Sequence, residues 1–127
     1  MQFASLEVFG MHRLVIDAWR RDFGEELLPI QQKAVRAGVL QGRRVLAVAP
    51  ASSGKTLIAE MAIASAAMSR SKSLYLVPTR ALAAEKLGQL SARFAPAGLR
   101  TIISTRDHPF SDPVALRGDF DVLVAVP

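Results

Sequence analysis

Residues 49–56 are the part of the sequence whose residue types and spacing are best suited to chemistry. They read Ala-Pro-Ala-Ser-Ser-Gly-Lys-Thr and lie between apolar segments at 45–48 and 57–68. A Gly-Lys-Thr ending between a strand and a helix is typical of a loop that binds the phosphates of a nucleoside triphosphate. Backbone N–H groups of such a loop converge on the phosphates, and the helix dipole favours negative charge at the same point.

The side chains of this loop have separate expected roles. Lys55 is predicted to place its ammonium group against the outer phosphates, and the Thr56 hydroxyl to ligate a magnesium ion, which makes these two the catalytic candidates. Ala49 stands where the general pattern has its first glycine, but small residues still allow close approach, so we interpret the loop as a working variant. The positions expected to bind the nucleotide here are Ala51, Ser52, Ser53, Gly54, Lys55 and Thr56.

Apolar periodicity predicts the elements that position this loop. A proline at position 29 suits the first turn of a helix, and glycines at 24 and 42 end helical patterns. Strands that are continuous apolar runs, bounded by helices, indicate a parallel α/β sheet. We expect helices over residues 6–23, 31–40, 57–68 and 79–94, buried strands over 45–48, 74–77, 99–104 and 122–126, and a loop over 106–118 with one helical turn near 114–116.

The composition is that of a folded protein with a basic balance. The chain has 127 residues, half of them hydrophobic, and no cysteine, so a core is expected without disulfides or thiolate metal sites. The 16 lysines and arginines against 11 acidic residues give a net charge of +5, which is compatible with a polyanionic partner. His12 and His108 have no metal-ligand partner at helical spacing and are interpreted as solvated surface residues.

Nothing in the sequence indicates a secretory or membrane segment. The first residues lack the basic-then-apolar layout of a signal peptide, and the alanine-rich segment at 59–68 is too short to span a bilayer. We therefore expect a soluble, cytoplasmic protein with no membrane partner.

Two further stretches flank the phosphate loop at telling distances. Residues 26–31 read Glu-Leu-Leu-Pro-Ile-Gln and resemble a Q motif, and residues 77–86 read Val-Pro-Thr-Arg-Ala-Leu-Ala-Ala-Glu-Lys and resemble motif Ia. With the loop itself, they make the chain similar to superfamily-two helicases of the DExH kind, especially their superkiller-like branch. The resemblance covers about residues 24–127. It implies a RecA-like P-loop domain, ATP and Mg²⁺ as cofactors, and single-stranded or partly duplex nucleic acid as partner.

The same resemblance implies roles for residues outside the loop. Gln31 would read the edge of adenine through the donor and acceptor of its side-chain amide. Thr79, Arg80 and Ala81 would hold the nucleic-acid backbone, and a hydroxyl, a guanidinium and helix-start N–H groups do suit a phosphate. Residues 104–107 resemble the family's S-T-G-D stretch, but Arg106 replaces the glycine, so a direct contact is not expected there.

Groups that hydrolysis needs are missing from the sequence. Magnesium requires a carboxylate at the end of a later strand, whereas Asp119 and Asp121 precede their apolar run and no D-E-x-x sequence follows. In this family the arginines that stabilise the transferred phosphate come from a second RecA-like domain, which is absent here. We therefore expect a partial RecA-like domain 1, incomplete at its C-terminal end, with an N-terminal helix within 1–24 and the motifs in 25–127.

The function expected from these features is the ATP-binding front half of an ATP-dependent DNA or RNA helicase or translocase, with little or no turnover alone. Two other classes remain open. One is a different P-loop enzyme, such as a nucleotide kinase or transporter ATPase, whose acceptor-site arginines or signature loop do not occur. The other is a nucleic-acid-binding module that has kept the fold without turnover, which would bind strands in a salt-sensitive manner regardless of nucleotide.

Overall fold

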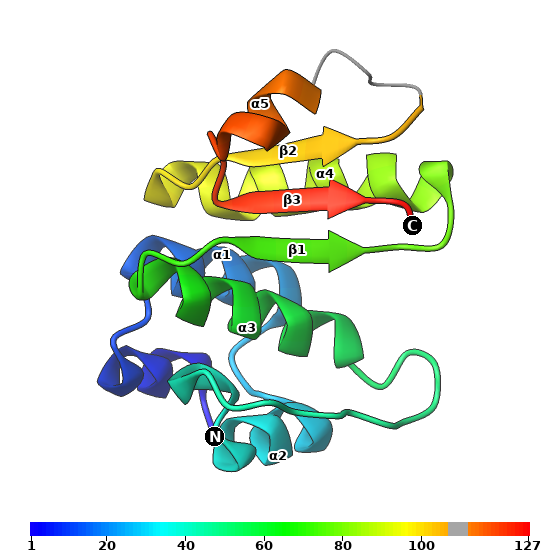
Figure 1. The fold of residues 1–127 in the computed structure, drawn as a ribbon. Coiled ribbons are helices and arrows are strands. Elements are labelled where there is room, and N and C mark those ends of the chain that lie inside the picture. Colours follow the sequence, from blue (N-terminus) through cyan, green and yellow to red (C-terminus); the bar gives the residue numbers. More distant parts are fainter. Residues whose placement is uncertain (107–111) are drawn as a thin grey trace. The chain divides into compact units, whose positions relative to one another are not determined.

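The computed structural model describes residues 1–106 and 112–127, which form two compact units, Met1–Ser69 and Arg70–Pro127 (Figure 1). The predicted division into an N-terminal helix and a motif-bearing region remains a prediction. The first unit contains η1 (Phe3–Phe9), α1 (Arg13–Phe23), α2 (Pro29–Ala37), η2 (Val39–Gln41) and α3 (Lys55–Met68). The second contains β1 (Ser73–Leu76), α4 (Arg80–Phe94), η3 (Ala95–Ala97), β2 (Thr101–Ser104), α5 (Asp112–Arg117) and β3 (Val122–Ala125).

The second unit is built on a parallel sheet, as the sequence predicts. The described strands run in the order β1-β3-β2, and Val122 of β3 aligns with Ser73 of β1 and with Thr101 of β2. Helix α4 runs along one face of this sheet (Figure 1). Its residues Leu90 and Phe94 are almost completely buried, as are Val122 and Val124 of the central strand. All three strands therefore end at the same edge, which places the loops after them side by side.

The core of the first unit gathers aromatic and aliphatic side chains from its helices. Phe3 and Trp19 are fully buried, and their ring centroids lie 6.3 Å apart. Glu60 of α3 is also fully buried, and one of its carboxylate oxygens accepts a hydrogen bond from the Trp19 indole N–H at 3.2 Å. This bond connects α1 to the helix that begins at the phosphate loop.

The predicted helix over residues 6–23 is interrupted. Gly10 has a φ of 81° and ends η1, and α1 starts only after His12, whose Nδ1 accepts a hydrogen bond from the Leu14 N–H at 3.1 Å. Glycine adopts this left-handed conformation without steric cost, so the helical segment ends at Gly10 although the apolar periodicity of the sequence continues. Val8, which belongs to the predicted apolar stripe, is consequently 87% exposed. Gly38, with a φ of 96°, likewise ends α2 earlier than the predicted residue 40.

The prediction of a buried strand over residues 45–48 is wrong. No strand pairs with this segment in the described part of the chain, and Leu46 and Val48 are 90% and 81% exposed. An apolar run becomes a strand only when a neighbouring strand takes up its backbone N–H and C=O groups. The apolar residues at 45–48 favour a strand conformation, but no neighbouring strand among the described residues is there to pair with them.

Burial of the next strand was also overestimated. β1 lies at one edge of the described sheet, and its Leu74 and Leu76 are 61% and 56% exposed, whereas Ser73 and Tyr75 are half-buried. Helices α3 and α4 and strands β2 and β3 lie close to their predicted positions. The predicted loop over 106–118 contains α5, a longer helix than the expected single turn, and part of that loop lies outside the described residues, as does His108. In the described part of the chain, no helix has the length and apolar character that crossing a bilayer requires.

Candidate functional site

The phosphate loop leads directly into α3. α3 begins at Lys55, and two residues just before it adopt left-handed conformations, Ser52 with a φ of 62° and Gly54 with a φ of 96°. The loop is closed by its own side chains, because the Ser53 hydroxyl donates to the Pro50 carbonyl at 2.6 Å. The Lys55 ammonium donates in the same way to the carbonyl of Ala49 at 2.5 Å.

A glycine is required at position 54 for space as well as for conformation. A Cβ atom placed on Gly54 would lie 2.6 Å from the side-chain nitrogen of Gln31 and 2.8 Å from a methyl carbon of Leu28. Contacts that short do not occur for real Cβ atoms, and the positive φ adds strain for any other residue. The start of α2 and the phosphate loop are therefore packed directly against each other.

Gln31 joins these two segments through both ends of its side-chain amide. Its oxygen accepts a hydrogen bond from the Leu28 N–H at 2.8 Å, and its nitrogen donates to the Gly54 carbonyl at 3.2 Å. The side chain is 97% buried, since only 3% of the residue is exposed. The donor and acceptor expected to read adenine are thus engaged in holding the loop against α2.

A pocket of about 330 Å³ brings Gln31 together with part of the phosphate loop. Of the predicted nucleotide-binding residues, Ser52, Gly54 and Thr56 line this pocket with Gln31, whereas Ala51, Ser53 and Lys55 do not. The remaining lining residues are Phe23, Glu26, Leu28 and Leu57. Gly54 and Gln31 are 23 positions apart in sequence yet line one cavity.

Phe23 is a pocket residue that the sequence assigned to a core-facing stripe. Its ring is 43% exposed, and it is the last residue of α1 before Gly24 turns the chain. An aromatic residue directly ahead of a helix-ending glycine, a few residues before the Q-like motif, was the available signal. A partly exposed ring in a pocket offers a flat apolar face for stacking.

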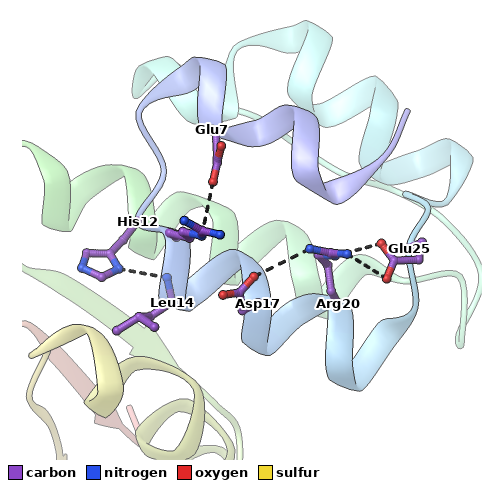
Figure 2. Close-up of polar contacts among 7 residues, drawn as sticks. Glu7, His12, Leu14, Asp17, Arg20 and Glu25 are labelled. Carbon is purple, nitrogen blue, oxygen red and sulfur yellow. Dashed lines mark hydrogen bonds and ion pairs between the residues drawn. The ribbon is translucent and has the colours of Figure 1, made fainter.

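An ion pair between Arg20 and Glu25 forms a charged clamp across the end of α1 (Figure 2). The Arg20 guanidinium makes a bidentate contact with the Glu25 carboxylate, at 2.8 Å from Nε and 3.1 Å from Nη2. Asp17 lies 3.8 Å from the same guanidinium. The hydrogen bond with Glu25, reinforced by its negative charge, raises the pKa of Arg20 above its usual value. The clamp spans Gly24 and so fixes the direction in which the chain leaves α1.

The groups at this site suit a nucleoside triphosphate carrying Mg²⁺. The first N–H groups of α3 have no acceptor within the helix, and the helix dipole would favour an anion at this end. Lys55 adds an ammonium group and Thr56 a hydroxyl, and both residues are exposed. The chain could therefore hold the phosphates at the start of α3 and the base near Gln31.

A second pocket, of about 410 Å³, lies in the other unit at the carboxyl ends of the strands. Its lining includes Thr79 and Arg80, as the motif Ia resemblance implies, but not Ala81. Thr79 caps α4, and its hydroxyl oxygen accepts a hydrogen bond from the Leu82 N–H at 3.2 Å. Arg106, for which no contact was expected, lines the same pocket. The other lining residues are Pro78, Thr105, Val126 and Pro127.

The two strand-borne acids lie at the opposite edge of the sheet, as the sequence predicts. Both precede β3, and each has a structural partner. The Asp119 carboxylate pairs with Arg117 at 3.0 Å, and the Asp121 carboxylate accepts a hydrogen bond from the Arg100 N–H at 2.8 Å. Within residues 1–106 and 112–127, no three acidic, histidine or cysteine residues cluster as a metal site would require.

A glycine-lysine-threonine loop at the start of a helix, together with a parallel sheet flanked by helices, defines a P-loop domain of the RecA-like class. The chain belongs to the DEAD/DEAH box helicase family, whose model matches residues 28–127. This confirms membership of the helicase superfamily that the motifs indicate.

Curated relatives agree with this family. The ATP-dependent DNA helicase Hel308 of Methanocella arvoryzae is 38% identical over 104 residues, which are 79% of this chain and 14% of that protein. Hel308 of Pyrococcus abyssi is 39% identical over 102 residues, which are 80% of this chain and again 14% of the relative. The chain thus spans about one-seventh of the length of these relatives.

Solved structures support the fold. The RNA helicase Prp28 from Chaetomium thermophilum bound to ADP aligns with a TM-score of 0.71 at 24% identity, covering 95% of this chain and 31% of that one. A hypothetical ATP-dependent RNA helicase from Sulfolobus tokodaii aligns with a TM-score of 0.71 at 21% identity, covering 92% and 34%. The RecA-like α/β fold predicted from the sequence is therefore confirmed.

Proposed function

We propose that this chain is the ATP-binding front half of an ATP-dependent helicase or translocase motor that acts on DNA. The observation that carries the proposal is the pocket that Gln31 shares with Ser52, Gly54 and Thr56. A base reader and a phosphate loop in one cavity are what a nucleotide needs. The relatives named ATP-dependent DNA helicases support DNA over RNA as the track, and the Q-like and Ia-like motifs support the superkiller-like branch.

The proposed roles follow the chemistry of each group. Ala51, Ser52, Ser53 and Gly54 supply backbone N–H groups to the phosphates. Lys55 leaves the Ala49 carbonyl to pair with the outer phosphates, and the Thr56 hydroxyl ligates Mg²⁺. Gln31 exchanges its hydrogen bonds to Leu28 and Gly54 for the adenine edge, and the ring of Phe23 is available to stack on the base.

In the second unit, Thr79, Arg80 and Ala81 hold the backbone of single-stranded or partly duplex nucleic acid. The Thr79 side chain caps α4, so its helix-start N–H groups are held in place for a phosphate, and Arg80 adds a guanidinium. A second RecA-like domain would supply the arginines for hydrolysis, and the motor would work in the cytoplasm.

Binding of the nucleotide can be tested directly by titrating the chain with a fluorescent ATP analogue and Mg²⁺. We expect measurable affinity that falls by about tenfold or more in Lys55→Ala, since a charge-assisted contact is lost. The matched control is Lys33→Ala, which removes the same charge from an exposed position of α2 outside the pocket. Equal affinities of the two variants would contradict the proposed phosphate site.

ATP hydrolysis is the second test, and here the expected result is the absence of activity. Because Asp119 and Asp121 lie at the amino edge of the sheet and have structural partners, we expect negligible Mg²⁺-dependent ATP hydrolysis by this chain, with or without single-stranded DNA. Clear hydrolysis that disappears in Lys55→Ala would show that the chain carries a complete hydrolytic site and would overturn this part of the proposal.

A further inference from the structure

The pocket at the carboxyl edge of the sheet collects residues from three separate strand ends. Thr79 and Arg80 follow β1, Thr105 and Arg106 follow β2, and Val126 follows β3. Figure 1 shows that the three strands point the same way, so their last residues meet at this edge. Two of the strands are followed by the same pair of residue types, a threonine and then an arginine, at 79–80 and 105–106.

The charged side chains described at this pocket have one sign. Among the lining residues that the structure describes, two carry guanidinium groups and none has an acidic side chain. In the part of the chain that the structure describes, no carboxylate forms an ion pair with Arg106, and the residue is exposed. An anion that binds in this pocket would be attracted by the guanidinium groups of both Arg80 and Arg106.

The remaining lining indicates which anion fits. Hydroxyl groups of Thr79 and Thr105 can donate to phosphate oxygens, and Pro78, Val126 and Pro127 add apolar surface. A cavity of about 410 Å³ has room for more than one phosphate group, so a sugar can lie against the apolar part while the guanidinium groups face the charge. A phosphodiester chain has both a charged phosphate and a less polar sugar in every nucleotide unit.

We propose that Arg106 is a second backbone-binding residue of the nucleic-acid site, which grips single-stranded DNA together with Arg80. The inference rests on the proposed function and adds a contact at the position where this sequence departs from the glycine of the resembling motif. It revises the expectation, drawn from that departure, that the segment makes no direct contact. Arg106 supplies a positive charge at the position where the related motif has an uncharged glycine.

The test is the salt dependence of DNA binding, measured by fluorescence anisotropy with a labelled oligothymidylate. Each phosphate contact on a single strand contributes about 0.7 to the slope of log affinity against log salt concentration. We expect Arg106→Ala to reduce the slope by about 0.7 and to weaken binding by about threefold to tenfold at low salt. Arg106→Lys should retain most of the slope, because the charge remains.

Arg100→Ala is the matched control. Arg100 is an exposed arginine that directly precedes β2, whereas Arg106 follows that strand. The two arginines therefore lie at opposite edges of the sheet. Its structural hydrogen bonds with Asp121 and Val122 involve its backbone N–H and C=O, which the substitution leaves in place. It removes the same charge from the chain, so a general effect of net charge would appear equally in both variants.

The outcomes separate this inference from the proposed function. If wild type binds the oligonucleotide, Arg80→Ala weakens it and Arg106→Ala behaves like Arg100→Ala, the inference fails while the nucleic-acid site stands. If wild type does not bind, the proposed site fails as well. Inorganic phosphate at matched ionic strength should not displace the oligonucleotide; displacement that requires Arg106 would assign the pocket to a free anion and overturn the inference.

Discussion

At the scale of single residues, Gln31 has the most consequential position, because both ends of its amide are hydrogen bonded to backbone groups. On its N6/N7 edge adenine presents an N–H donor beside a ring-nitrogen acceptor, whereas the O6/N7 edge of guanine presents two acceptors, so on this edge only adenine matches an amide in full. We expect Gln31→Ala to remove any preference for ATP over GTP, as measured by competition against the fluorescent analogue. It should also lower the free energy of unfolding by about 1–3 kcal/mol, since Leu28 N–H and Gly54 C=O lose their partner.

The neighbouring Gln32 provides the control for that prediction. Its side-chain nitrogen donates to the Leu27 carbonyl at 2.9 Å, and it does not line the pocket. Gln32→Ala should cost a similar hydrogen bond in stability and leave the base preference unchanged. A loss of base preference in Gln32→Ala, or its retention in Gln31→Ala, would contradict the role assigned to Gln31.

At the scale of elements, α3 carries the phosphate loop at its first residue and is tied to α1 through the buried bond between Trp19 and Glu60. We expect the pair to be energetically coupled. A double-mutant cycle with Trp19→Phe and Glu60→Leu, followed by urea unfolding, should give a coupling of about 1 kcal/mol or more. Single effects that add to within about 0.3–0.5 kcal/mol would show that the bond contributes little to holding α1 on α3.

The elements also show what the sequence could and could not predict. Helices α3 and α4 follow from local signals, such as the loop before Lys55 and the cap at Thr79, which need no distant partner. The strand predicted over 45–48 does not form, because a strand requires hydrogen bonds to a neighbouring strand from another part of the chain. The break at Gly10 depends on a backbone angle that the apolar pattern does not report.

The candidate site divides in the same way. The Q-like motif and the phosphate loop predicted Gln31, Ser52, Gly54 and Thr56 as site residues, and these four line one pocket. Phe23 and Arg106 enter their pockets through three-dimensional proximity alone. Their residue types are equally compatible with an apolar stripe or a solvated loop, so the sequence signals at these two positions did not single out the pockets.

At the scale of the whole molecule, exposed apolar residues on an edge strand predict self-association. Leu74 and Leu76 of β1 are more than half exposed, and an edge strand offers unpaired backbone groups to another chain. We expect the chain to associate with increasing concentration in sedimentation experiments. Leu74→Lys with Leu76→Lys should shift the distribution toward monomer.

The control for association is Val8→Lys, which adds one positive charge at an 87% exposed position outside the strands, to be compared with Leu74→Lys alone. Val8→Lys should leave the distribution unchanged. A sharp, cooperative melt of a monodisperse wild-type monomer would contradict the prediction that this edge drives association.

The two hydrogen bonds of Gln31 also constrain how such a protein can be engineered. On the proposed adenine contact, a base that engages the amide competes with Leu28 and Gly54 for the same two atoms, so base recognition and loop geometry are reciprocally linked. A substitution chosen to accept guanine at this position would therefore alter the phosphate cradle at the same time. A change of base specificity would require a new hydrogen-bond donor for the Gly54 carbonyl. Base specificity at this site therefore cannot be changed by a single substitution.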